Sequence, residues 1–128
     1  MKLLRYWKPF AIGLIILYGS LTSGNKLPDV HLFNFKHFDK IVHFILYLIF
    51  TVTLYRVILL QTYRTKSINL LITVLIAVFY GLLMESFQYI FTDDRSPEFL
   101  DALANTLGSI TGVIVYPVFV KLNIHKYL

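Results

Sequence analysis

Four apolar stretches, each about as long as a bilayer is thick, occupy most of this chain of 128 residues. They lie at about residues 9–24, 41–60, 67–91 and 101–120. A helix needs roughly 20 apolar residues to cross a bilayer, at a rise of about 1.5 Å per residue. Hydrophobic residues make up 57% of the chain and charged residues only 15%, which is too apolar for the surface of a soluble domain. We therefore predict an all-α membrane protein, a four-transmembrane-helix bundle.

The three connections between these stretches are short enough for one compact bundle, so we expect residues 1–128 to form a single transmembrane domain. The first stretch also resembles a secretory signal, because basic residues precede its apolar run. The run is long for a signal, and Ser20 and Thr22 make a poor cleavage site. An uncleaved first helix is therefore the preferred interpretation.

The basic residues are divided unequally between the two sides that this topology defines. One side, which holds both termini, carries eight basic residues and no acidic residue: Lys2, Arg5, Lys8, Arg56, Arg64, Lys66, Lys121 and Lys126. The other side carries four basic and six acidic residues: Lys26, Lys36, Lys40 and Arg95, with Asp29, Asp39, Asp93, Asp94, Glu98 and Asp101. Basic residues concentrate on the cytoplasmic side of membrane proteins, so both termini are predicted to be cytoplasmic. This asymmetry explains the net charge of +5 without a nucleic-acid partner.

Polar side chains recur at helical spacing near the outer ends of three predicted spans. They are Asp39, His43 and Tyr47 on the second span, Glu85, Gln88 and Tyr89 on the third, and Asp101 and Asn105 on the fourth. Residues three or four apart share one face of a helix. Because these three ends lie on the same side of the membrane, the pattern predicts a polar site at the outer membrane face.

Glu85 is the most constrained of these residues, because apolar sequence continues for more than a turn after it. A carboxylate well inside a span costs roughly 2.5–3.5 kcal/mol on insertion scales. We expect Glu85 to face the bundle, to be protonated, or to pair with a cation. The available partners are Lys40, His43 and Arg95, of which Arg95 is best suited to a bidentate contact.

Several of these positions also have purely structural interpretations. Asp39 could be the N-cap of the second helix, and Asp101 a first-turn acid favoured by the helix dipole. Gly108 and Gly112 form a ridge of small residues that typically packs against another helix. The same ridge would also permit a homo-oligomer.

The quoted motifs resemble those of the VanZ-like family. The segment Asp39-Lys40-Ile41-Val42-His43-Phe44-Ile45-Leu46-Tyr47 is similar to its first motif. A second block starts with Glu85-Ser86-Phe87-Gln88, includes Arg95 and Asp101-Ala102-Leu103-Ala104-Asn105-Thr106-Leu107-Gly108, and ends at Gly112. The resemblance covers roughly residues 39–116.

This resemblance implies a small, bacterial, multi-pass protein of the cytoplasmic (inner) membrane, in a family associated with teicoplanin-type glycopeptide antibiotic resistance. The positions carried over are Asp39, Lys40, His43, Glu85, Gln88, Arg95, Asp101 and Asn105. The sequence Thr92-Asp93-Asp94 stands where relatives often have a Pro/Gly turn, and this difference affects where Arg95 would point.

The first functional hypothesis is the binding or remodelling of a lipid-linked cell-envelope precursor or a glycopeptide, with membrane lipids as further partners. The residues predicted to contact the ligand are Asp39, Lys40, Gln88, Arg95 and Asn105. Lys40 and Arg95 would contact phosphate or carboxylate groups of that ligand.

The second hypothesis is an intramembrane hydrolase or transferase acting on a polyprenyl or phospholipid substrate. Its catalytic residues would be His43, Glu85 and Asp101, with His43 as general acid or base. The same three residues could hold a divalent metal, but the chain has no closely spaced metal motif, so no metal or cofactor is predicted. The absence of cysteine excludes thiol nucleophiles and Cys-ligated zinc. A third hypothesis is a structural scaffold, in which the polar residues only lock the helices together.

Overall fold

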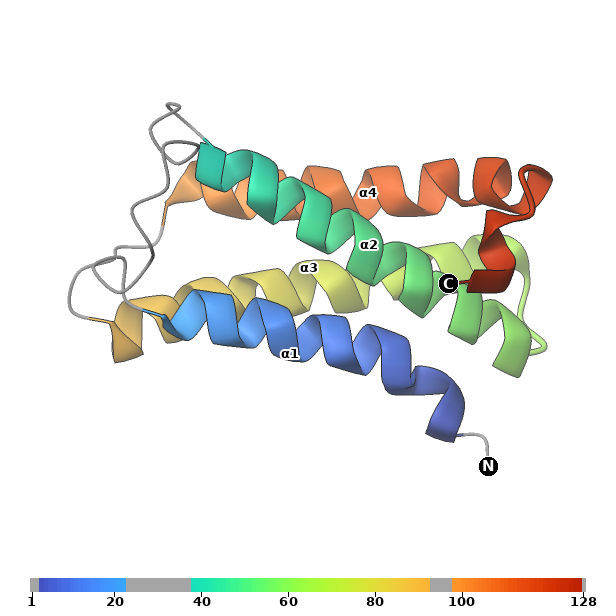
Figure 1. The fold of residues 1–128 in the computed structure, drawn as a ribbon, viewed down its shortest axis with the longest axis horizontal. Helices are drawn as coiled ribbons and strands as arrows, with labels where there is room; N and C mark the ends of the chain where they lie inside the picture. The colour runs from blue at the N-terminus through green and yellow to red at the C-terminus, as the bar shows by residue number, and fades with distance from the viewer. Residues whose placement is uncertain (1–2, 23–37, 93–97, 128) are drawn as a thin grey trace.

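The computed structural model describes residues 3–22, 38–92 and 98–127, and within them every regular element is helical. The elements are η1 (Leu3–Tyr6), α1 (Trp7–Leu21), α2 (Phe38–Gln61), α3 (Lys66–Phe91), α4 (Phe99–Lys121) and η4 (Ile124–Tyr127). The predicted all-α architecture with four main helices is confirmed (Figure 1).

Three of these helices are long and apolar enough to cross a membrane. They are α2, α3 and α4, with 24, 26 and 23 residues. Helix α1 is apolar but has only 15 residues, which gives a length of about 22 Å against roughly 30 Å for the hydrocarbon core. It ends at Leu21, before the predicted boundary at residue 24.

The helix starts show which capping predictions hold. Asp39 is the second residue of α2 and not its N-cap, because the helix already begins at Phe38. The carboxylate of Asp39 instead forms an ion pair with Lys40. The position of Asp39 at the start of the predicted helix does not indicate this contact. Asp101 lies in the first turn of α4, as predicted. At the start of α3, the side chain of Thr65 accepts a hydrogen bond from the backbone N–H of Ile68.

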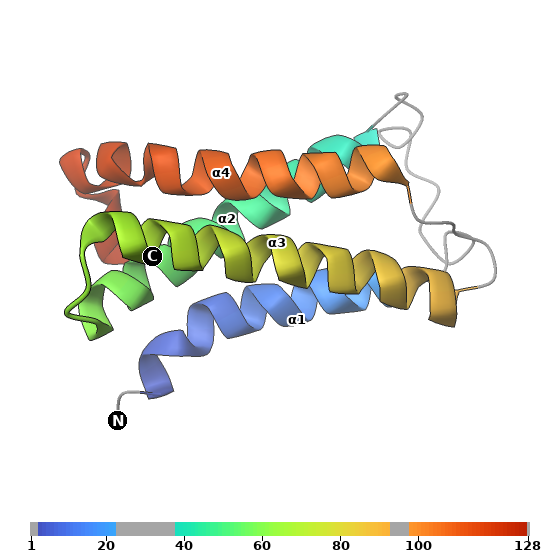
Figure 2. The same cartoon turned by 180° about the vertical axis from the view of Figure 1, so that it is seen from behind.

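The helices run up and down along the long axis of the molecule, so α1 begins and α4 ends at the same end of the bundle (Figure 1). Helices α2 and α4 form the most extensive helix–helix contact. Helix α1 packs on α2 and α3, on the side away from α4 (Figures 1 and 2). A hydrogen bond of 2.6 Å from the hydroxyl of Tyr80 to the carbonyl of Gly13 joins α3 to α1.

The buried side chains form two clusters. The larger joins α1, α2 and α3 and contains Ile16, Tyr47, Phe50, Leu54, Ile58, Ala77 and Met84. The smaller joins α2 to α4 and contains Val52, Tyr55, Val113 and Tyr116. The outward faces of the long helices are also apolar, with residues such as Ile45, Phe79 and Ile114 exposed. A large exposed apolar surface on helices of spanning length identifies a membrane protein.

The glycine ridge of α4 explains how closely α2 and α4 approach. A Cβ atom at Gly108 would overlap the backbone carbonyl of Phe44, and one at Gly112 would lie 2.8 Å from the carbonyl oxygen of Leu48. The predicted packing role of the ridge is therefore confirmed. Both glycines are buried against α2 of the same chain, so the structure does not support a homo-oligomer built through this ridge.

Candidate functional site

Polar side chains gather at the end of the bundle where α2 and α4 begin and α3 ends (Figure 1). We call this group the polar cluster; it consists of Asp39, Lys40, His43, Glu85, Glu98, Asp101 and Asn105. Three helices supply it, as the sequence pattern predicted. The members of the cluster lie towards the ends of the three helices. The length of the apolar segments therefore determines how deep in the membrane the cluster lies.

Lys40 is the centre of an ion-pair network. Its ammonium group lies 2.5 Å from Asp39 Oδ2, 2.5 Å from Glu98 Oε2 and 2.9 Å from Asp101 Oδ1. Only 15% of the Lys40 side chain is exposed, and Asp101 is buried, whereas Glu98 is largely exposed. The ammonium thus joins the start of α2 to the start of α4. An ammonium group has three N–H donors, and three carboxylates already surround it.

A second chain of contacts runs from α2 through α4 to α3. The Nδ1 atom of His43 lies 2.9 Å from Asn105 Oδ1, and Asn105 Nδ2 donates to Glu85 Oε1 at 3.4 Å. With its amide nitrogen directed at Glu85, Asn105 presents its oxygen to His43. Nδ1 of His43 is then the protonated nitrogen, and Nε2 remains available as a base or ligand atom. Asn105, only 2% exposed, therefore sets the tautomer of His43.

Two buried oxygen atoms beside this chain have no hydrogen-bond partner within the part of the protein that the structure describes. They are Oε2 of Glu85 and the hydroxyl of Tyr47. Glu85 is 6% exposed and Tyr47 is 1% exposed. A buried polar atom without a partner costs about 1–3 kcal/mol, so such atoms commonly mark a place where a ligand or water completes the site.

A cavity of about 360 Å³ between α3 and α4 reaches Glu85 from the side of the bundle. Its lining is mainly apolar and includes Leu82, Tyr89, Ile90 and Phe99. Each of these four side chains is also exposed on the outer surface of its helix. The cavity therefore connects the lipid-facing surface to the buried carboxylate.

The polar cluster contains an excess of acidic groups. Among the residues that the structure describes here, the cluster contains four carboxyl groups (Asp39, Glu85, Glu98 and Asp101) and the single ammonium of Lys40, which pairs with three of them. One ligand atom from each of His43, Glu85 and Asp101 lies within 4.8 Å of the others, and a second such group consists of Asp39, Glu98 and Asp101. Imidazole and carboxylates are ligand types that divalent metals accept. The arrangement is suited to sharing protons or holding a cation, and Lys40 is not free to bind an anion.

Most residues predicted for the site meet in the polar cluster, with two exceptions. Gln88 is buried one turn beyond Glu85, where its backbone carbonyl accepts from Thr92. Arg95 lies outside the residues that the structure describes. One residue of the polar cluster was not predicted as a site residue: Glu98, which pairs with Lys40 and lies one helical turn before Asp101, so helical spacing could have indicated it. Tyr47 belonged to the predicted polar stripe of the second span but was given no role in the site.

The comparison with protein families matches the VanZ/LLP1 family over residues 5–120. The chain belongs to the VanZ/LLP1 family. The match includes α1 as well as the two motif blocks, so it extends over the whole four-helix bundle. Neither the curated proteins nor the solved structures gave a match.

Proposed function

We propose that this VanZ/LLP1 protein binds a lipid-linked cell-envelope molecule or a glycopeptide at its polar cluster. The observation that carries the proposal is the Glu85 carboxylate, which is buried, has an oxygen without a partner, and borders a cavity open to lipid. An acceptor in that position favours a ligand with an O–H or N–H donor. Sugar hydroxyls and amino groups of envelope precursors and glycopeptides supply such donors.

The cavity also supports a lipid anchor on the ligand. Leu82, Ile90 and Phe99 would contact its hydrocarbon chain, while Glu85 would accept from its polar head. Asn105 would orient this contact, because its amide already donates to the other oxygen of Glu85. Lys40 would hold α2 and α4 together through its three carboxylates, a role different from the phosphate contact that the sequence suggested.

The same proposal includes an orientation. The start of α1 and the end of α4 lie at one end of the bundle, which is consistent with two termini on one side of the membrane (Figure 1). That end carries Arg5, Lys8, Arg56 and Lys121. By the preference of basic residues for the cytoplasmic side, the polar cluster faces the outside of a bacterial inner membrane.

Replacing Glu85 with glutamine tests the binding site, because the side chain keeps its shape but loses its charge. Lipids and glycans that co-purify with wild-type protein are identified by mass spectrometry, and teicoplanin is titrated separately onto the protein in nanodiscs. We expect one ligand class to be retained by the wild type and reduced roughly tenfold or more in Glu85→Gln, since hydrogen bonds to charged groups contribute about 1.5–3 kcal/mol.

The matched control is Ser86→Ala. Ser86 lines the same cavity, but its hydroxyl bonds to the carbonyl of Leu82 in its own helix. Retention should stay at the wild-type level in this variant. Equal retention by Glu85→Gln and the wild type would contradict the proposed site. A lower folded yield of Glu85→Gln without a selective loss of ligand would instead favour the scaffold role.

A second candidate function is hydrolysis or group transfer on a polyprenyl or phospholipid substrate. The observation that favours it is the His43–Asn105–Glu85 chain, which leaves His43 Nε2 available as a general base. Asp101 lies close enough to His43 and Glu85 to complete a metal site with them. Elemental analysis of purified protein tests the metal-dependent form: a stoichiometric divalent metal that is lost in His43→Gln supports it, and metal-free protein removes it.

A further inference from the structure

The cavity of about 360 Å³ between α3 and α4, which we call the side cavity, has an uneven distribution of charge. Two carboxylates border it, those of Glu85 in α3 and Glu98 at the N-cap of α4, and its described lining contains no basic residue. The other polar groups of this lining are the hydroxyls of Ser86 and Tyr89. The Ser86 hydroxyl donates to the carbonyl of Leu82 in its own helix. A ligand that enters the side cavity therefore meets mainly acceptor oxygens and negative charge.

The charge of these two carboxylates is only partly balanced by the residues that the structure describes. Glu85 is 6% exposed; its Oε1 accepts from the neutral amide of Asn105, and its Oε2 has no hydrogen-bond partner there. Glu98 contacts Lys40, but the same ammonium group also pairs with two other carboxylates of the polar cluster. A buried carboxylate without a counter-charge is costly. A positively charged ligand would lower this cost.

The rest of the lining indicates which kind of cation fits. Leu82, Ile90 and Phe99 line the side cavity and are exposed on the outer surface of the bundle, so the cavity opens towards lipid. Hydrocarbon side chains offer no ligand atom to a metal ion, whereas they pack favourably against an alkyl chain. Tyr89 and Phe99 also add aromatic rings to the lining, and the face of such a ring attracts an ammonium group. The ligand that matches this lining has an ammonium head and a hydrocarbon tail.

We propose that the side cavity selects its ligand through a primary ammonium group attached to a hydrocarbon chain. The ammonium group donates to Glu85 and Glu98, and the chain lies along Leu82 and Ile90. The inference rests on the function proposed above and narrows it, because an amino group is preferred to the sugar hydroxyls that also supply donors. An ammonium group neutralises a carboxylate, which a hydroxyl does not, and the attraction between opposite charges is strong where water is excluded. The same carboxylates repel an ionised phosphate, so the phosphate of a lipid-linked ligand lies outside the side cavity.

Photoaffinity labelling tests this selection at the cavity itself. The probes are a long-chain primary amine, the matching alcohol and the matching carboxylic acid, each with one diazirine in its chain. The full chain is labelled in phosphatidylcholine nanodiscs, whose headgroups have no N–H donor, and the labelled residues are identified by mass spectrometry. Labelling of Leu82, Ile90 and Phe99 is divided by that of Ile45, an exposed residue of α2, which corrects for different partitioning of the probes into the bilayer.

We expect this ratio to be higher for the amine than for the alcohol by roughly fivefold or more, and to be lowest for the acid. Even exposed ion pairs reach about fivefold, and Glu85 is buried. In Glu85→Gln the preference for the amine should largely disappear. If this variant does not fold, Glu98→Gln makes the same test with a smaller expected loss, because 53% of the Glu98 side chain is exposed. The matched control is Ser86→Ala, which leaves both carboxylates of the cavity in place and should keep the wild-type preference.

The outcomes separate this inference from the function on which it rests. Equal labelling of the cavity by the amine and the alcohol overturns the inference but leaves the proposed function standing, because both chains then reach the cavity. Labelling of the cavity by neither probe contradicts both. An equal preference in the wild type and in Glu85→Gln also overturns the inference.

The source of the ammonium group is distinguished by adding phosphatidylethanolamine, whose headgroup carries a primary ammonium group. Reduced labelling of the cavity by the amine supports the inference and identifies a membrane lipid as the ligand. Unchanged labelling, with the preference for the amine retained, supports it with another amphiphile that carries an amino group. Loss of amine labelling on addition of a stoichiometric divalent metal overturns the inference and assigns Glu85 to the metal site of the second candidate function.

Discussion

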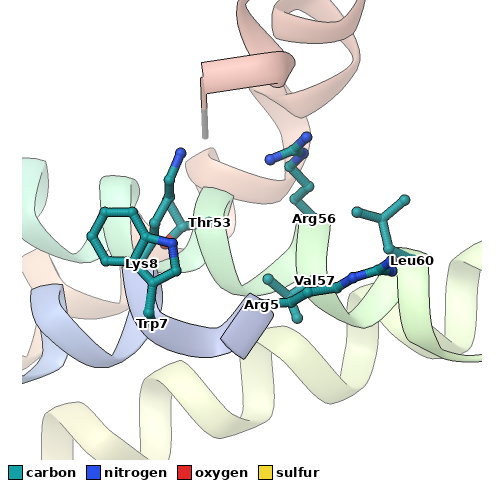
Figure 3. A pocket seen from close by; sticks show the side chains of 7 residues that line it. All are labelled: Arg5, Trp7, Lys8, Thr53, Arg56, Val57 and Leu60. Carbon is teal, nitrogen blue, oxygen red and sulfur yellow. The ribbon is translucent and has the colours of Figure 1, made fainter. Parts of the chain in front are cut away.

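The two ends of the bundle use charged residues in opposite ways. At the polar cluster, Lys40 is largely buried and three carboxylates surround its ammonium group. At the opposite end of the bundle, Arg5, Lys8 and Arg56 border a cavity of about 520 Å³, and no acidic residue is part of its described lining (Figure 3). A lysine therefore joins two helices through its carboxylate partners at one end, whereas at the other end a lysine lies beside a tryptophan ring and two arginines at the edge of a cavity. The comparison shows that the partners of a charged residue decide its role, and residue type alone does not.

The largest effect expected from this comparison concerns Lys40. Lys40→Met leaves buried Asp101 without its counter-ion, and removing one member of a buried ion pair typically costs 3–5 kcal/mol. Lys8→Met at the cavity of the opposite end should change the free energy of unfolding by less than about 0.5 kcal/mol. Both values are measured by SDS titration of the protein in mixed micelles, followed by circular dichroism. Similar costs for the two variants would show that the two ends do not differ in this way.

A smaller effect is expected where α4 meets α2 beneath the polar cluster. Gly108→Ala places a methyl group on the carbonyl of Phe44, and overpacking of this kind typically costs about 1–3 kcal/mol. Gly19→Ala in α1 is the matched control, because a Cβ atom there has nothing within 4 Å. Alanine also has the higher helix propensity, so the control should be neutral or slightly stabilising. Thermal unfolding of the two variants in detergent compares them, and a stable Gly108→Ala would contradict the close approach of the two helices.

The smallest effect is expected at the rim of the polar cluster. Glu98 contacts Lys40, but 53% of its side chain is exposed. Exposed ion pairs contribute about 0.2–1 kcal/mol, so Glu98→Gln should cost no more than this. The cost should shrink further at high salt, since screening weakens exposed pairs. A cost that equals that of Lys40→Met at every salt concentration would show that Glu98 is as essential as the buried partners.

Much of this architecture follows from sequence because apolar length and helical spacing are local properties. The long helices begin and end within about three residues of the predicted spans, and His43, Glu85, Asp101 and Asn105 meet as their spacing indicated. Each helix presents one face to its neighbours. Polar residues on that face therefore come close to those of the adjacent helices when they lie at the same depth in the membrane.

Other features depend on distances between helices, which spacing along one helix does not contain. From the sequence, Lys40 was expected to contact a phosphate group of a ligand or to pair with Glu85. In the structure its ammonium group is surrounded by three other carboxylates, those of Asp39, Glu98 and Asp101. The sequence allowed Asp39 to be a helix cap as well as a site residue, because the apolar run does not reveal that the helix already starts at Phe38. The cavity at the opposite end was not predicted, because Arg5, Lys8 and Arg56 had been interpreted only as topology signals.

The contact between α2 and α4 has a consequence for how the chain is made. Lys40 meets Glu98, and His43 meets Asn105, across 58 and 62 residues of sequence. At roughly 5–20 residues per second, the ribosome needs about 3–12 s to supply those partners after Lys40 and His43 have been synthesised. During that interval the charged start of α2 must stay near the headgroups or the insertion machinery, because hydrocarbon would not tolerate it alone. A nascent chain that lacks α4 therefore contains Lys40 and His43 without the partners that Glu98 and Asn105 provide in the complete bundle.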